Sequence, residues 1–245
     1  MTFRDHFSAG SAGYARFRPR YPDALFAWLA GQAPAREQAV DVATGTGQAA
    51  VALASLFRRT HAFDASAAQI RQATLAPDLT YAVAPAEAIP MPAASTHLLT
   101  VAQALHWLDL DRFYAEARRI LVPGGLLAVW TYNRLTVDRD VDAVVEHLYM
   151  DIVGTDWPAE RQQVESGYRD LPFPFSPVEV PAFTMGAEWD AGELLGYLAT
   201  WSAVHRHRER TGNDPLALIA GDLRRHFGPG RRPVRWPLAI RAGRP

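Results

Sequence analysis

The chain contains 245 residues, of which 49% are hydrophobic, and its formal net charge is −1. This composition supplies a large apolar core and excludes a chain that is disordered throughout. The near-zero charge gives no overall positive field for nucleic acid, and the absence of cysteine excludes disulfide and thiol chemistry. Arg4, Asp5 and His6 stand where a signal peptide needs an apolar block, and no later run is apolar enough to span a membrane. We therefore expect a cytoplasmic protein that binds neither nucleic acid nor membrane; its oligomeric state is not readable from the sequence.

The first part of the chain alternates between predicted helices and strands. A helix follows Pro22 and ends at Gly31, and an apolar run at residues 40–42 leads into a glycine turn. Strands are then predicted at residues 60–64, 79–83, 97–101 and 126–131, with helices beginning after Ser66 and at Asp111. Strands separated by helices favour a parallel sheet with helices on both faces and ligands beyond the carboxyl ends of the strands.

The pattern changes after residue 137. Apolar positions at residues 141–152 predict a long amphipathic helix, a second helix starts at Pro158, and residues 171–181 are irregular and rich in proline. A strand is predicted at residues 178–184, helices after Asp190 and Asp214, and a last strand at residues 234–240, where Pro237 predicts a bulge or an edge. We interpret residues 1–36 as an arm and helix, 37–135 as the cofactor-binding core, and 136–245 as a helical cap with the last strands, all in a single domain.

The glycine turn is the most informative segment. Residues 45–50 fit the pattern G-x-G-x-x-A, in which glycine lets the backbone turn tightly and approach a ligand at the start of the next helix. Asp64 follows about twenty residues later, as a ribose-binding carboxylate does, so this pattern alone would suit a nicotinamide-dependent oxidoreductase. Asp41 argues against that alternative, because a negative charge beside the turn gains nothing from a pyrophosphate. It suits a ligand with an ammonium group, either by direct contact or by ordering the loop.

Several segments together resemble the class I S-adenosylmethionine-dependent methyltransferases. Residues 41–47 (DVATGTG) resemble their first motif, residues 86–92 (AEAIPMP) and 119–125 (RILVPGG) resemble two later ones, and Asp64 matches the acidic residue that ends their second strand. Residues 14–22 and 102–107 look like the small-molecule branch that includes trans-aconitate methyltransferase-like (methyltransferase type 11) proteins. The resemblance implies a three-layer, Rossmann-like, seven-stranded and mostly parallel sheet with helices on both faces and a helical cap.

The resemblance also implies S-adenosyl-L-methionine as the cofactor and a set of residues around it. The glycines approach its amino-acid end, Asp64 binds the ribose, the segment at Ala86 flanks the adenine, and Gln103 lies near the methionine moiety. The implied cofactor residues are Tyr14, Arg18, Asp41, Ala43, Gly45, Gly47, Asp64, Ala65, Ala86, Glu87 and Gln103.

Two positions depart from the family pattern. Ala43 replaces a glycine, and its methyl group is tolerable only if the backbone there is not left-handed. Pro85 stands where many relatives place an aspartate that binds the adenine amino group, so the adenine would be held by backbone, by Glu87 or by apolar packing.

Methyl transfer is an in-line displacement, so it depends on a positioned nucleophile more than on a dedicated acid. We expect a small-molecule acceptor with an oxygen nucleophile such as a carboxylate. His106 is the candidate catalytic residue, as a base, although a role in fixing its loop by a hydrogen bond is favoured. Trp107, Tyr132 and Trp201 are candidates for acceptor binding, and for Trp201 a core or surface role is favoured. No metal site is expected, because the histidines at 205 and 207 have no partner at ligand spacing. A protein that binds the cofactor without catalysis remains the alternative from another class.

Overall fold

The computed structural model describes residues 19–245, so the predictions for Tyr14 and Arg18 lie outside the described residues. Its main sheet has the strand order β3-β2-β1-β4-β5-β8-β6. Five strands run parallel, namely β1 (Gln38–Val42), β2 (Arg59–Asp64), β3 (Leu79–Val83), β4 (Thr96–Ala102) and β5 (Leu121–Tyr132). Strand β8 (Arg232–Arg244) runs antiparallel between β5 and the short β6 (Ser176–Val178). The predicted parallel core is therefore confirmed.

Helices cover the two faces of this sheet. The helices of this part are α2 (Asp23–Gln32), α3 (Gln48–Ala54), α4 (Ala67–Arg71) and α5 (Leu110–Ile120), with a 3-10 turn η1 (Leu105–Trp107) after β4. Side chains alternate along β5: Leu126, Ala128 and Trp130 enter one hydrophobic cluster together with residues of α2 and α3. Leu127 and Val129 enter a second cluster with residues of α5. This two-residue period places the sheet between two helical layers, as the Rossmann-like prediction requires.

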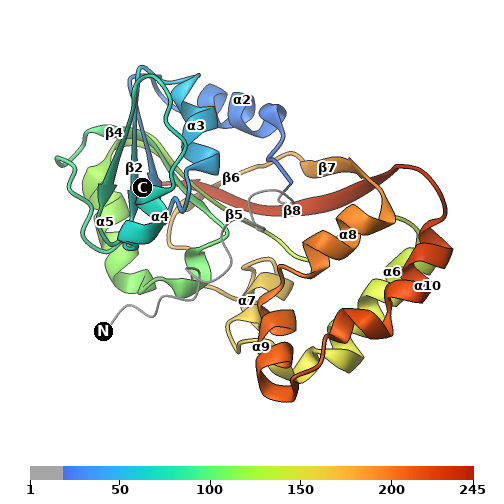
Figure 1. Ribbon diagram of the computed structural model, residues 1–245. Coiled ribbons are helices and arrows are strands. Elements are labelled where there is room, and N and C mark those ends of the chain that lie inside the picture. The colour runs from blue at the N-terminus through green and yellow to red at the C-terminus, as the bar shows by residue number, and fades with distance from the viewer. Residues whose placement is uncertain (1–18) are drawn as a thin grey trace.

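The remaining elements form a cap of helices beside the sheet. They are α6 (Arg139–His147), which continues as a π-helical turn η2 (Leu148–Ile152), then η3 (Gly154–Asp156), α7 (Arg161–Glu165), α8 (Ala191–Leu198), α9 (Ser202–Thr211), η4 (Pro215–Leu218) and α10 (Ala220–Phe227). Figure 1 shows α6, α8, α9 and α10 gathered on one side of the molecule. Asp156 joins η3 to α9 by accepting hydrogen bonds from His207 (2.9 Å) and Arg210 (2.8 Å). The pKa of Asp156 falls to about 2, chiefly because of the Arg210 hydrogen bonds.

One long strand connects the sheet with the cap. The second half of β8 pairs with β5, from Leu238 opposite Tyr132 onward, whereas its first half pairs with β7 (Thr184–Trp189). Pro237 stands where β8 changes partner, opposite Thr184, which explains how a residue without a donor is tolerated there. Figure 1 shows β8 crossing the molecule between the two parts.

The predicted strand at residues 178–184 is wrong in its middle. Residues 179–183 are not strand; only the ends pair, with β6 ending at Val178 and β7 beginning at Thr184. Pro181 lies inside the stretch and cannot donate to a ladder, and the stretch forms no strand; the carbonyl of Phe183 accepts a hydrogen bond from the N–H of Leu238 in β8 (2.9 Å). Within residues 19–245, no helix combines the length and the apolar character needed to cross a bilayer.

Candidate active site

The glycine loop is held by a buried carboxylate at the end of β1. Asp41 is only 1% exposed, and its two oxygens accept hydrogen bonds from the hydroxyl groups of Thr100 and Thr44, each at 2.6 Å. Thr100 belongs to the neighbouring strand β4, and Thr44 to the loop itself. Asp41 therefore orders the loop through a threonine hydroxyl. Burial raises the pKa of Asp41 from 3.8 to about 6, against the lowering effect of both hydroxyls.

Ala43 corrects an expectation. Its φ is 51°, so the backbone is left-handed at the position where the sequence replaces the family glycine. A methyl group in this conformation costs about 1–2 kcal/mol relative to the right-handed form. The turn is kept because the next residue, Thr44, donates its N–H to the carbonyl of Phe63 (3.0 Å) while its hydroxyl binds Asp41. The loop tolerates alanine at the expense of local strain.

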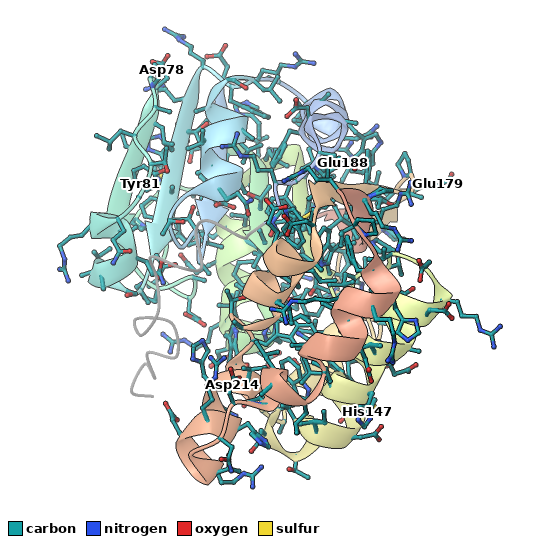
Figure 2. All side chains as sticks on the ribbon, turned by 45° about the vertical axis from the view of Figure 1, so that its right-hand side comes forward. Asp78, Tyr81, His147, Glu179, Glu188 and Asp214 are labelled. Atoms are coloured by element: carbon teal, nitrogen blue, oxygen red, sulfur yellow. The ribbon has the colours of Figure 1, made fainter. Side chains whose placement is uncertain are left out.

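The two glycines of the loop meet different surroundings. Both have positive φ, 58° at Gly45 and 88° at Gly47. A Cβ at Gly47 would lie 2.0 Å from the hydroxyl oxygen of Tyr81, which stands on β3 (Figure 2), so a larger residue would have to displace that side chain and adopt a strained φ. A Cβ at Gly45 would have no heavy atom closer than 3.9 Å. The backbone at Gly45 is thus open to a ligand, as a cofactor loop requires.

The end of β2 is tied to the same loop. One oxygen of Asp64 accepts the N–H of Gly45 and the other accepts the N–H of Ser66, both at 2.8 Å. Ala65 lies between them and is half-buried. Beyond the end of β3, Ala86 is buried and Glu87 accepts a hydrogen bond from the backbone N–H of Asp109 (2.9 Å). The structure therefore brings the predicted residues of β1, β2 and β3 to one edge of the sheet.

Gln103 follows β4 and is fixed against the end of β5. Its φ is 56°, and its N–H donates to the carbonyl of Trp130 (2.8 Å). Its side-chain oxygen accepts hydrogen bonds from the Thr131 hydroxyl and from the N–H of Tyr132 (3.2 Å), and its amide nitrogen donates to the carbonyl of Tyr132 (3.1 Å). The Tyr132 side chain is buried, and its ring packs edge-on to Tyr21.

His106 lies in η1, three residues after Gln103. Its Nδ1 is 2.9 Å from the hydroxyl oxygen of Tyr168, and the Trp107 ring lies 4.7 Å from the His106 ring. Burial, with a smaller contribution from the Arg161 charge, lowers the pKa of His106 to about 4. His106 is therefore a neutral imidazole near pH 7, hydrogen-bonded to a tyrosine that the sequence analysis did not single out.

Arg161 also lies near this edge of the sheet, and it was not predicted from the sequence. Arg161, at the start of α7, donates to the Tyr149 hydroxyl (2.7 Å) and to the side-chain oxygen of Asn133 (2.5 Å), the residue that follows β5. Its guanidinium lies 4.6 Å from the centre of the Trp157 ring. The ring of Trp201 lies 5.5 Å from that of Trp157, which places the predicted acceptor residue Trp201 in the same cluster. Trp157 precedes α7 and is not part of a helix, so no helical spacing marked this pair in the sequence.

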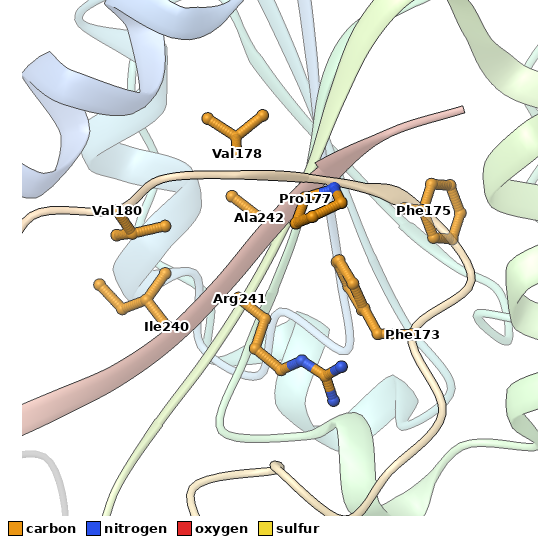
Figure 3. Close-up of a pocket in the computed structure, with 8 residues that line it drawn as sticks. All are labelled: Phe173, Phe175, Pro177, Val178, Val180, Ile240, Arg241 and Ala242. Atoms are coloured by element: carbon orange, nitrogen blue, oxygen red, sulfur yellow. The ribbon is translucent and has the colours of Figure 1, made fainter.

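A separate hollow of about 400 Å³ lies where β6 meets β8 (Figure 3). It is lined by apolar side chains and by Arg241, and none of the predicted site residues lines it. Arg241 has a structural task there: its Nη1 donates to the carbonyls of Tyr168 (2.6 Å) and Leu171 (2.7 Å). The described residues contain no group of three or more His, Asp or Glu side chains placed to hold a metal ion.

The strand order and the antiparallel β8 define a Rossmann-like protein, and the glycine loop tied to Asp64 suits a nucleoside cofactor. Comparison with known proteins identifies the family. Residues 40–129 match the methyltransferase domain family. A protein of Dictyostelium discoideum that is named as a methyltransferase is 33% identical over 90% of this chain and 86% of its own, and an uncharacterized methyltransferase of Mycobacterium tuberculosis is 32% identical over 71% and 67%.

A solved structure agrees with these relatives. A chain from Anaeromyxobacter dehalogenans, described as a type II methyltransferase, is 54% identical, with a TM-score of 0.89 over 93% of this chain and 97% of that one. The chain belongs to the class I S-adenosylmethionine-dependent methyltransferases, and S-adenosyl-L-methionine is its cofactor.

The raised pKa of Asp41 predicts a pH-dependent stability. Because the folded protein favours protonated Asp41, its stabilising contribution is present below pH 3.8 and is lost as the pH rises through about 6. Relative to Asp41→Asn, the wild-type protein should lose on the order of 3 kcal/mol of unfolding free energy between about pH 4 and about pH 8. Denaturant unfolding of both proteins across this range measures it, with Asp222→Asn on the exposed face of α10 as the control. A difference between wild type and Asp41→Asn that does not change with pH would contradict the assignment.

The left-handed backbone at Ala43 predicts that Ala43→Gly stabilises the protein. Relief of the strained φ should exceed the entropy cost of glycine and raise the unfolding free energy by up to about 1 kcal/mol. Thermal unfolding measures this effect. Ala94→Gly, at a second left-handed alanine (φ 46°) outside the site, should act in the same direction. Ala52→Gly, inside α3, should destabilise the protein. If Ala43→Gly behaves like Ala52→Gly, the loop is not strained at residue 43.

Proposed function

We propose that the protein transfers a methyl group to an oxygen of a small-molecule carboxylate and so forms a methyl ester. When bound, S-adenosylmethionine supplies a sulfonium methyl group; a carboxylate oxygen forms the new bond to carbon while the carbon–sulfur electron pair stays on sulfur. The rate then depends on how the protein holds the acceptor behind that methyl group and keeps water away.

We assign the cofactor to the edge formed by β3, β2, β1 and β4. The backbone at Gly45 and Gly47 approaches its amino-acid end, where Asp41 and Ala43 shape the loop, and Gln103 lies near the methionine moiety. Asp64 and Ala65 hold the ribose, and Ala86 and Glu87 flank the adenine. The open space above Gly45 and the anchored Asp64 support this placement. Tyr14 and Arg18, which lie outside the described residues, complete the proposed set of cofactor-binding residues on the family resemblance alone.

The observation that carries the carboxylate assignment is the state of Arg161. Its hydrogen-bond partners, the Tyr149 hydroxyl and the Asn133 amide oxygen, are both uncharged. Within residues 19–245, no carboxylate forms an ion pair with it. The Tyr149 hydroxyl donates in turn to the Glu165 carboxylate, so that anion reaches Arg161 only through a hydroxyl group. A partly buried guanidinium with no direct ion pair can still bind a carboxylate by charge-assisted hydrogen bonds. Arg161 therefore supports an anionic acceptor between the sheet edge and the cap.

His106 supports the same class of acceptor. A base whose conjugate acid has a pKa of about 4 is poorly matched to a hydroxyl group, which must lose a proton during the reaction. A carboxylate is already ionised near neutral pH and needs no base. We therefore propose that His106 positions the acceptor and that Trp107, Tyr132 and Trp201 contribute apolar and aromatic surface to its site. The net charge of −1 favours a small molecule over nucleic acid, and the cysteine-free composition favours a cytoplasmic location.

An isotope-transfer experiment tests the reaction class. The protein is incubated with S-adenosylmethionine carrying a labelled methyl group and with matched pairs of small carboxylates, primary alcohols and amines. Mass spectrometry should detect labelled methyl esters and no labelled ethers or N-methyl products. Labelling of the alcohols or amines in the absence of any ester would overturn the proposal.

Arg161 provides the residue-level prediction. Arg161→Met keeps the length of the side chain but removes the charge, so the KM for the carboxylate acceptor should rise roughly 10- to 100-fold, the range of a hydrogen bond to a charged group. The affinity for S-adenosylmethionine, measured by calorimetry, should change little. Arg225→Met, which removes an exposed arginine paired with Asp222 on α10, is the matched control. An unchanged acceptor KM in Arg161→Met would exclude Arg161 from acceptor binding.

A further inference from the structure

A gap lies along the side of β8 that faces away from β5, between the two strands that pair with it there. β7 pairs with the first half of β8 as far as Pro237, and β6 pairs with it only from Ala242 onward. The Leu238 N–H donates to the carbonyl of Phe183 (2.9 Å), so residues 239–241 have no strand partner on this side within residues 19–245. The hollow of about 400 Å³ lies at this gap (Figure 3).

The walls of the hollow are apolar and belong to both faces of the sheet. Val178, Val180 and Ile240 pack against the hydrophobic cluster that contains residues of α2 and α3. Phe173 packs against the cluster that contains residues of α5. A volume of this size falls within the range of small-molecule sites, roughly 300–1,000 Å³. The open backbone at residues 239–241 is shorter than an ordinary strand of about five or six residues, so the gap suits a compact ligand better than an added strand.

Arg241 is the charged residue of the lining, and it has no carboxylate partner among the ion pairs of the described residues. Its Nη1 donates to two backbone carbonyls, and its guanidinium carbon lies 4.7 Å from the centre of the Phe173 ring. Nε and Nη2 donate to no group of residues 19–245, and neither is among the enclosed polar atoms there that lack a partner. The edge of the guanidinium that carries these two nitrogens is therefore accessible, and such an edge binds a carboxylate through two parallel hydrogen bonds.

The charges around the hollow favour an anion. Arg118 lies over the Phe175 ring at 4.8 Å and donates to the carbonyl of Pro174, and it too forms no ion pair in the part of the chain that the structure describes. Glu179 follows Val178, but its side chain is exposed and does not line the hollow (Figure 2). Two cations thus flank the aromatic wall, and no carboxylate lines the hollow to oppose them.

We propose that the gap between β6 and β7 is a binding site for an amphipathic carboxylate. The Nε–H and Nη2–H groups of Arg241 bind the two carboxylate oxygens, and the aliphatic tail lies against Val178, Val180 and Ile240. The apolar walls supply most of the contact area, and the arginine sets the orientation of the ligand. This site is separate from the acceptor site proposed at Arg161, so the inference does not depend on the proposed reaction.

Methyl NMR of the full-length protein labelled at isoleucine tests the site, with hexanoate as the probe. The Ile240 signal is assigned by its loss in Ile240→Val. Hexanoate should shift this signal at neutral pH. Acetate, which lacks the tail, and hexanamide, which lacks the charge, should leave it in place at the same concentration. An Ile240 signal that hexanoate does not move, or that hexanamide moves equally, overturns the proposal.

Matched substitutions locate the bound hexanoate. Val180→Trp fills the hollow from a position outside the strands and should abolish the shift, whereas Glu179→Trp places the same side chain on the exposed neighbour and should retain it. Arg241→Met should weaken hexanoate binding roughly 10- to 100-fold, the range of a hydrogen bond to a charged group. Arg161→Met should leave it unchanged.

A full hexanoate shift in Val180→Trp overturns the proposal, even if Arg241→Met fails to fold, because the hollow is then not the site. Loss of the shift in Arg161→Met also overturns it, because hexanoate would then bind at the proposed acceptor site. Failure of the proposed reaction would appear separately, as an absence of labelled methyl esters while hexanoate still shifts the Ile240 signal.

Discussion

The conformation of the glycine loop, at the edge of the sheet, depends on one buried carboxylate, that of Asp41. Asp41 joins β1 to β4 through Thr100 and to the glycine loop through Thr44, and the carboxylate itself is buried. Desolvation disfavours its ionised form, so the hydrogen bonds of two hydroxyls stabilise a charge that burial opposes. The left-handed backbone at Ala43 follows from this arrangement, because Thr44 must reach both Asp41 and the end of β2. The strained backbone at Ala43 lowers the stability of the protein, and it holds the loop in one conformation.

Two further groups of hydrogen bonds lie at the neighbouring strands and toward the cap. Gln103 accepts hydrogen bonds from the Thr131 hydroxyl and the Tyr132 N–H at the end of β5, and Tyr168 hydrogen-bonds to His106. One group of hydrogen bonds thus joins the end of β4 to β5, and a second joins His106 of η1, three residues further along the chain from Gln103, to the segment after α7. The residues within each group share hydrogen bonds, so their contributions to stability are not additive.

The core of the fold was predictable from the sequence because its signals are local. Short apolar runs between helices marked the parallel strands, and the helix predicted after Asp190 begins there, where Asp190 and Glu193 form a capping box. Residues of the proposed acceptor site were harder to predict. Arg161 follows an irregular segment and Tyr168 stands in the turn after α7, and they contact Asn133 and His106, which lie far away in the sequence. The backbone at Ala43 was mispredicted because contacts of Thr44 outweigh the local preference of alanine.

The route of β8 has a consequence for the order of folding. β8 pairs with β5, β6 and β7, and it follows all three in the chain. Until it is in place, the edge of β5 presents unpaired backbone groups, and the cap is not joined to the sheet by that strand. These pairings span long stretches of sequence, and contacts of that kind form slowly. During synthesis, before β8 is made, the growing polypeptide therefore exposes unpaired N–H and C=O groups along β5. Such an edge can pair with another chain, so this topology favours aggregation of nascent chains.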